Sequence, residues 1–147
     1  MGVGHIVKAI EHDVTAESLI SVLSGKGTVD VVTMSYSFSM IPDRNATIKN
    51  INQLLKPNGH VLITDFFVYG NYDEYLSPLF ANLRSMERWF HRTWWSFDHV
   101  FLLEDDDINF NEDAWEVVWD KRERGAVPFL PFLKPYHGVF IMRKKAT

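Results

Sequence analysis

The stretch "VDVVTMSYSFSMIPD", from Val29 to Asp43, contains the change of pattern that decides the fold. It begins with β-branched, almost continuously apolar residues up to Thr33–Met34, which is typical of a parallel strand covered on both faces. Polar and aromatic residues then alternate, and Pro42-Asp43 opens a helix. Parallel α/β sheets bind their ligands just beyond such strand ends, so this segment is a candidate site.

The residues that follow predict a βαβ unit. Four apolar residues recur at helical spacing after Asp43: Ile48, Ile51, Leu54 and Leu55. "KPNG" at 56–59 carries the proline and Asn-Gly signals that end a helix in a turn. "HVLIT" at 60–64 predicts the next strand. A strand, a helix and a strand in so short a stretch imply that the two strands are parallel.

Upstream of this unit, the sequence predicts one more strand and one more helix. His5–Ile10 is a short apolar strand candidate. Thr15–Leu23 reads as a helix with Thr15 as its N-cap and an apolar face at Leu19, Ile20 and Leu23. Glycine follows in "SGKG" at 24–27, where it can adopt a left-handed C-cap.

The second half of the chain has a different texture. Residues 74–92 are helical in tendency, and aromatic residues crowd 89–101. Two late strands, at 114–119 and 137–142, have no clear helix between them and therefore predict an antiparallel pair at the sheet edge. We expect one α/β domain in three parts: a cofactor-side βαβ part at 1–68, an aromatic substrate-side insertion at 69–113 and a terminal strand pair at 114–147.

Composition excludes several classes of function. The chain has 147 residues, 46% of them hydrophobic and 23% charged, as in globular proteins with an apolar core. A net charge of −4 argues against a surface that binds the phosphates of a nucleic acid. The absence of cysteine excludes disulfides and a thiolate nucleophile, and the six histidines lack metal-ligand spacing, so we expect no metal site. No stretch has a membrane span's length. We expect an intracellular protein, cytoplasmic or peripheral on the cytosolic face of a membrane.

Two strand ends carry the candidate site residues. Ser35, Tyr36 and Ser37 follow the second strand, and Asp65-Phe66 follows the third. One interpretation is a ligand site formed where these two strands end. The alternative is that the aromatic residues pack against the next helix while the serines cap loops and Asp65 bonds to backbone amides. The residues alone leave both open.

The order of these segments resembles a known family. "VDVVTMSYSFSMIPD…INQLLKPNGHVLITDFF" is similar to the middle of class I S-adenosylmethionine-dependent methyltransferases. "SYSFSMIP", "HRTWWSFDHVFL" and "PYHGVFIMRK" narrow the resemblance to the N-methyltransferase part of betaine-lipid synthases. That family methylates the amine of a diacylglyceryl-homoserine headgroup three times. The resemblance covers nearly the whole chain and implies a Rossmann-like α/β sheet.

The resemblance implies roles for particular residues at the cofactor. S-adenosylmethionine would be the cofactor, with Asp13 accepting from the adenine amino group and Val14 beside it. Ser35 and Tyr36 would line the methyl-transfer site. The Tyr36 hydroxyl, or Asp65, would orient or deprotonate the attacking amine. A simple helix-start acid is the alternative for Asp13.

The aromatic insertion would bind the lipid headgroup. Ser37 would contact the substrate, and Arg88, His91 and Arg92 would pair with its carboxylate. Trp94 and Trp95 would hold the increasingly methylated ammonium by cation–π attraction, worth about 0.5–2 kcal/mol per ring. A core-facing helix stripe is the alternative for the tryptophans. The partners implied are a lipid headgroup at a membrane surface and a fused or associated aminocarboxypropyl-transferase domain.

The family's sheet has the strand order 3-2-1-4-5-7-6 and a glycine-rich cofactor turn after its first strand. Gly2 and Gly4 precede a strand instead of following one, so the turn has no counterpart here. We therefore expect the C-terminal portion of a larger enzyme, with an apolar edge strand at 29–34. Because the glycine-rich cofactor loop is missing, the expectation is that this portion is incomplete and could be inactive alone. Two other functions stay open: a methyltransferase for another small amine, and a non-catalytic remnant acting as an interaction module.

Overall fold

A computed structural model describes residues 9–67, 86, 89, 93, 102–103, 110, 113–125 and 136–146. Its elements in chain order are α1 (Leu19–Val22), β1 (Val29–Ser35), the short 3-10 helix η1 (Phe38–Met40), α2 (Arg44–Leu54), β2 (Leu55–Phe67), β3 (Trp115–Arg124) and β4 (Tyr136–Lys144). Among these described residues, no helix is long and apolar enough to cross a membrane.

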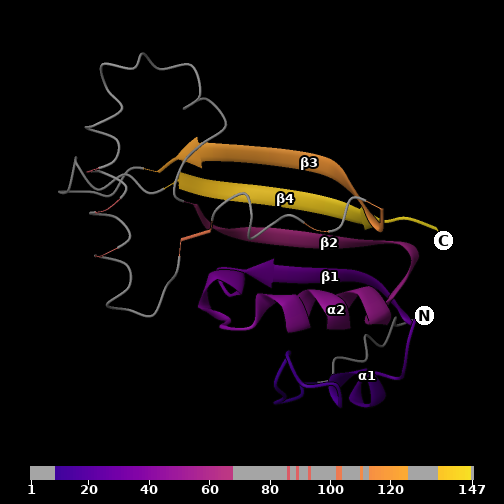
Figure 1. Ribbon diagram of the computed structural model, residues 1–147. Coiled ribbons are helices and arrows are strands. Elements are labelled where there is room, and N and C mark those ends of the chain that lie inside the picture. Colours follow the sequence, from indigo (N-terminus) through magenta and orange to yellow (C-terminus); the bar gives the residue numbers. More distant parts are fainter. Residues whose placement is uncertain are drawn as a thin grey trace, which may run out of the picture.

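The four strands form one mixed sheet in the order β1-β2-β4-β3 (Figure 1). β1 runs parallel to β2, whereas β4 is antiparallel to both β2 and β3. The predicted parallel pair and the predicted antiparallel C-terminal pair are therefore confirmed. Taken in space, the strands follow the 4-5-7-6 part of the sheet order that the resemblance implies. The fold is part of a Rossmann-like α/β sheet, as the resemblance implies.

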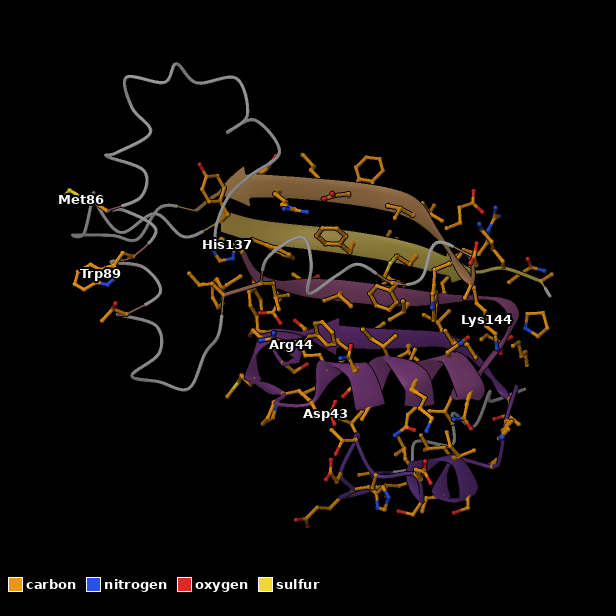
Figure 2. The ribbon with its side chains drawn as sticks, in the orientation of Figure 1. Asp43, Arg44, Met86, Trp89, His137 and Lys144 are labelled. Carbon is orange, nitrogen blue, oxygen red and sulfur yellow. The ribbon has the colours of Figure 1, made fainter. Side chains whose placement is uncertain are left out.

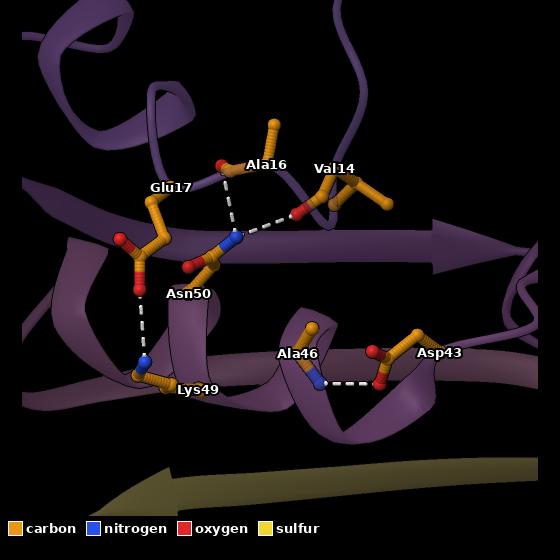
Figure 3. A network of polar contacts seen from close by, with 7 residues as sticks. All are labelled: Val14, Ala16, Glu17, Asp43, Ala46, Lys49 and Asn50. Atoms are coloured by element: carbon orange, nitrogen blue, oxygen red, sulfur yellow. Dashed lines mark hydrogen bonds and ion pairs between the residues drawn. The ribbon is translucent and has the colours of Figure 1, made fainter.

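One face of the sheet is buried beneath α2. Asp43 begins this helix by accepting the Ala46 N–H at Oδ1 over 2.9 Å, a side-chain N-cap (Figure 3). Ile51 on the helix then packs against Val61 and Ile63 of β2 in the main hydrophobic cluster. The same cluster includes Phe38, Phe67, Leu103, Phe110, Trp115, Phe140 and Met142. This buried face supplies the apolar area that stabilises the fold.

The opposite face of the sheet, which we call the open face, carries exposed side chains among the described residues. The ladder registers place Val31, Trp119 and Val139 on this face. Val31 and Val139 pair with β2 residues on the side away from α2, and Trp119 pairs with Ile141 of β4, which pairs with Leu62 on that same side. Val31 is 50% exposed and Trp119 53% exposed. The prediction that the strand at 29–34 is covered on both faces is wrong. β1 is instead the edge strand of the described sheet, as expected from the strand order.

The first predicted helix is much shorter than its sequence pattern suggested. α1 covers only Leu19–Val22, and Thr15 does not cap it. Thr15 instead donates both its backbone N–H and its hydroxyl to Asp13 Oδ1, each over 2.8 Å. The left-handed turn after α1 is confirmed, since Ser24 and Gly25 both have positive φ. The local Asp13–Thr15 turn competes with helix formation and delays its start.

The boundary between α2 and β2 also differs from the prediction. α2 ends at Leu54 and β2 begins at once with Leu55. "KPNG" at 56–59 therefore lies within the first residues of β2 and does not separate the helix from the strand. Asn58 has φ 63°, the left-handed conformation that Asn-Gly predicts. Most of the strand predicted at His5–Ile10 lies outside the described residues, and Ala9 and Ile10 are not in a strand.

Candidate active site

Three aromatic side chains meet where the parallel strands end: Tyr36 after β1, Phe66 near the end of β2 and His137 near the start of β4. We call them the strand-end cluster. The ring centroids of Tyr36 and Phe66 are 4.9 Å apart, and those of Phe66 and His137 are 4.8 Å apart. The Tyr36 hydroxyl is 3.1 Å from His137 Nδ1, a hydrogen bond between residues 101 positions apart. Figure 2 shows His137 near the start of β4 and Lys144 at the other end of the same strand.

Backbone contacts hold Tyr36 in an unusual conformation. Its φ is 48°, in the left-handed region that a tyrosine seldom adopts. Its N–H donates to the Thr64 carbonyl over 2.7 Å, and Leu103 N–H donates to the Phe66 carbonyl next along β2. β1 thus leaves the sheet at Tyr36. The Tyr36 residue is 42% exposed, at the point where the parallel strands end. Such strained residues concentrate at functional sites.

Asp65 lies inside β2, two residues before its end, and not after the strand as predicted. Its side chain is fully buried on the α2 face. Oδ2 accepts the Ser39 N–H over 2.9 Å and Oδ1 accepts the Phe66 N–H over 2.8 Å. The carboxylate therefore ties η1 to the sheet and fixes the loop that follows Tyr36. These bonds are the backbone-amide alternative that the sequence left open.

Asp13 and Val14 lie in the segment that packs against α2. The backbone carbonyls of Val14 and Ala16 both accept from the Asn50 amide, over 2.9 and 3.1 Å (Figure 3). Asp13 is exposed, and the hydrogen bonds from the Thr15 backbone and hydroxyl lower the pKa of its carboxyl group below the usual value. Within the described part of the chain, no hydrogen bond or ring contact links Asp13 to the strand-end cluster.

The remaining predicted site residues fall into two groups. Ser35 is the last residue of β1 and pairs with Thr64, while Ser37 precedes η1 without capping it through its side chain. The residues predicted to bind the headgroup lie outside the described residues: Arg88, His91, Arg92, Trp94 and Trp95. No group of histidine and acidic residues within the described ranges is placed to hold a metal ion.

The sequence pattern did not identify His137 as a site residue, and it assigned no role to Phe66. Phe66 and His137 are direct partners in the β2–β4 ladder, so their side chains share one face of the sheet. The only sequence signal was a histidine at the start of the strand "HGVFIM". Antiparallel pairing brings the start of β4 to the end of β2, and hence to Tyr36. A polar residue at the start of an antiparallel neighbour is therefore a candidate for the same site.

The arrangement supports two kinds of chemistry. A phenol hydroxyl in contact with an imidazole nitrogen can pass a proton between the two groups. Exposed aromatic faces attract cations by about 0.5–2 kcal/mol per ring. Both properties suit a reaction in which an amine loses a proton and a positive charge is present.

Comparison with known proteins agrees with this architecture. A protein-family model described as "Methyltransferase domain" matches residues 5–116. Since that match covers most of the chain, the protein belongs to this methyltransferase-domain family. No curated protein matches the chain in sequence.

Solved structures share the fold at low sequence identity. A SAM-dependent methyltransferase from Methanosarcina mazei is similar with a TM-score of 0.61 and 13% identity, over 92% of this chain and 66% of that one. A candidate methyltransferase from Bacillus halodurans gives a TM-score of 0.62 and 9% identity, over 93% of this chain and 71% of that one. The YcgJ protein from Bacillus subtilis gives a TM-score of 0.51 and 10% identity, over 83% of this chain and 66% of that one. The chain thus spans about two thirds of the length of these structures.

Proposed function

We propose that this protein takes part in S-adenosylmethionine-dependent N-methylation, with the amine of a diacylglyceryl-homoserine-type lipid headgroup as the acceptor. The observation that carries the proposal is the strand-end cluster, where the Tyr36 hydroxyl, the Phe66 ring and the His137 imidazole meet. Membership of the methyltransferase-domain family supports the cofactor. The motifs shared with betaine-lipid synthases support the amine acceptor.

The described residues fit the cofactor at two of its groups. S-adenosylmethionine supplies a sulfonium-bound methyl group, and the exposed ring of Tyr36 is suited to the positive charge. Asp13 is exposed, and the Thr15 hydrogen bonds that lower its pKa favour the carboxylate. Both of those bonds go to Oδ1, so within the described residues Oδ2 is left open for the adenine amino group. Val14 and Ser35 complete the cofactor-side set.

Tyr36 and Asp65 have different tasks in this proposal. Methyl transfer requires a neutral amine, and the Tyr36 hydroxyl is the exposed group at the strand mouth that can orient it and accept its proton. Asp65 has both oxygens bound to backbone N–H groups and is fully buried, so it positions the loop and does not reach the amine. Ser37 begins that loop and contributes to the substrate side.

The headgroup side rests on the aromatic insertion. Arg88, His91 and Arg92 would pair with the homoserine carboxylate, and Trp94 and Trp95 would hold the growing ammonium. Trp89 in the same segment is helical and 69% exposed, which suits contact with a lipid surface. The protein would then act peripherally on the cytosolic face of a membrane, with a fused or associated aminocarboxypropyl-transferase domain supplying the headgroup.

The test of the cofactor site is a calorimetric and thermal-shift titration with S-adenosylhomocysteine. Wild type, Asp13→Ala and the matched control Glu11→Ala would be compared, because Glu11 is an exposed acid two residues away. We expect binding by wild type and Glu11→Ala, and at least about tenfold weaker binding by Asp13→Ala, which corresponds to loss of one charge-assisted hydrogen bond. A folded chain that does not bind would contradict the cofactor assignment.

The test of the acceptor uses vesicles that contain diacylglyceryl-homoserine and S-adenosylmethionine labelled in its methyl group. Label recovered in the lipid supports the lipid amine. Transfer to a soluble amine such as free homoserine, without transfer to vesicles, would favour a methyltransferase for another small amine. Cofactor binding without transfer to either acceptor would favour a non-catalytic interaction module.

A further inference from the structure

A side-chain hydrogen bond joins His137 to Tyr36 within the strand-end cluster. The distance from the Tyr36 hydroxyl to His137 Nδ1 is 3.1 Å. The two rings meet edge to face, with centroids 5.9 Å apart and planes at 83°. The distance between the two atoms is within the range of a hydrogen bond. Tyr36 donates in this contact when His137 is the Nε2–H tautomer, and accepts when Nδ1 carries the proton.

Both partners are held in place before any ligand arrives. Tyr36 is fixed by its left-handed backbone and its N–H bond to Thr64. His137 is fixed by β4, where it pairs with Phe66 of β2 on one side and with Glu123 of β3 on the other. Phe66 also packs against both rings. Positive φ is unfavourable for a tyrosine, so the surrounding contacts must offset the strain.

One acidic side chain of β3 faces His137 on the open face of the sheet. Glu123 is its cross-strand neighbour in β3 and presents a carboxylate on the same face. Lys121 binds Glu123 over 2.6 Å and lowers the pKa of its carboxyl group, so the carboxylate is ionised at neutral pH. From β2 the facing residue is the uncharged Phe66, and Asp65 lies on the opposite face of the sheet.

We infer that His137 accepts, through the Tyr36 hydroxyl, the proton that the acceptor amine loses. The inference rests on the proposed function and adds a residue to it. The ammonium N–H bond breaks as its proton passes to the Tyr36 oxygen, and the Tyr36 O–H bond breaks as that hydrogen passes to His137 Nδ1. The amine is left neutral with a free electron pair, Tyr36 is unchanged, and His137 becomes imidazolium. The imidazolium then loses one proton to water, and proton exchange with water restores the Nε2–H tautomer for the next turnover. His137 is a positioning and relay residue, because it acts on the amine only through Tyr36.

The relay makes a prediction that does not depend on activity. Nδ1 can accept from Tyr36 only if the neutral imidazole carries its proton on Nε2. Nitrogen-15 NMR of the full chain should show His137 as the Nε2–H tautomer in wild type. The His137 signals should shift in Tyr36→Phe, whereas those of His60 should not, since His60 lies at the other end of the same sheet face. An Nδ1–H tautomer for His137 would overturn the inference.

The kinetic test compares His137→Ala, Tyr36→Phe, the double variant and the matched control His60→Ala, with diacylglyceryl-homoserine vesicles as substrate. We expect His137→Ala to lower kcat by about 10²-fold, the scale of general acid–base catalysis, with little change in KM. The double variant should lose no more than Tyr36→Phe alone, because the two groups act in series. Added imidazole should recover part of the His137→Ala activity, and His60→Ala should behave as wild type.

Several outcomes separate the possible failures. If wild type neither binds S-adenosylhomocysteine nor transfers methyl groups, the proposed function fails and the relay falls with it. If wild type is active and His137→Ala matches it, only the relay is overturned. A His137→Ala variant with a raised KM, unchanged kcat and no response to imidazole would make His137 a substrate-binding residue and would also overturn the relay. Melting temperatures of the variants show whether each is folded.

Discussion

The two faces of the sheet share the same strands and differ in almost everything else. On the α2 face, Val61, Ile63 and Phe67 of β2 are fully buried in one hydrophobic cluster. On the open face, Val31 and Trp119 are half exposed. The contacts that stabilise the fold are therefore concentrated on one face, while the aromatic side chains of the candidate site project from the end of the other. Stability and chemistry should respond to different substitutions.

The α2 face also reaches the end of the sheet, immediately behind the strand-end cluster. Gly138 and Asp65 are ladder partners on this face, one residue away from His137 and Phe66 respectively. Both are buried. The open-face site is thus supported from behind by tightly packed residues. The predictions below test how completely the two faces are separated.

The largest effect on stability is expected for Gly138→Ala. A Cβ at this position would overlap the Phe67 ring and lie 3.2 Å from the Arg122 Cγ atom. Phe67 cannot easily yield, since it packs on Phe140 and on the Arg122 guanidinium, each about 5 Å from its ring centre. Overpacking of this kind typically costs 1–3 kcal/mol, and we expect about 3 kcal/mol in denaturant unfolding.

The double variant Gly138→Ala with Phe67→Leu tests the cause of that loss. Because leucine gives up part of the overlapping ring, the double variant should be more stable than the sum of the single changes predicts, by roughly 1 kcal/mol. Additive losses would mean that the overlap with Phe67 is not the origin of the effect.

Asp65→Asn should have the next largest effect. Both carboxylate oxygens accept backbone N–H groups, and an asparagine amide would place an NH₂ group against one of those donors. Hydrogen bonds to charged groups contribute about 1.5–3 kcal/mol, so we expect a loss of about 2 kcal/mol in unfolding free energy. The matched control is Asp43→Asn, where asparagine is as good an N-cap as aspartate and the change should be nearly neutral. Equal effects at both positions would contradict the anchoring role of Asp65.

Much of the fold could be predicted because local signals agreed with tertiary packing. The Asp43 N-cap and the apolar spacing of Ile51 and Leu54 place α2 correctly. The α1 prediction failed because Asp13 binds Thr15 locally, and apolar periodicity does not report such competition. The covering of β1 was mispredicted for a different reason. A nearly continuous apolar strand normally indicates two covered faces, but Val31 of β1 is 50% exposed.

The site was predictable only in part. Tyr36 could be placed at the strand mouth, because strand ends converge in a parallel sheet. Its partner His137 follows it by 101 positions in the sequence, and only the antiparallel β2–β4 register brings the two together. Asp65 shows the reverse case. Its position near a strand end suggested chemistry, but its side chain points to the buried face because side chains alternate along a strand.

Two valines provide a matched comparison of the faces. Val61 of β2 is fully buried on the α2 face, and Val139 of β4 is 37% exposed on the open face. We expect Val61→Ala to cost about 1.5 kcal/mol, from lost burial and a residual cavity. Val139→Ala should cost about 0.5 kcal/mol or less, because the side chain already contacts water. Similar losses would show that something covers the open face in solution.

The smallest effect concerns the pH dependence of stability. On the open face, Arg143 binds the Glu116 carboxylate over 2.6 Å, and this hydrogen bond lowers the pKa of Glu116 below its ordinary value of 4.5. A carboxyl group with a lower pKa in the folded state stabilises the fold above the unfolded value and loses that contribution as the pH falls through the folded value. Between pH 6 and pH 3, the melting temperature of wild type should therefore fall slightly more than that of Glu116→Gln. Arg143→Met should remove the difference, since the pKa shift depends on the guanidinium. The pair is exposed and worth little, so parallel melting curves for wild type and Glu116→Gln would show that the open face contributes nothing measurable through this contact.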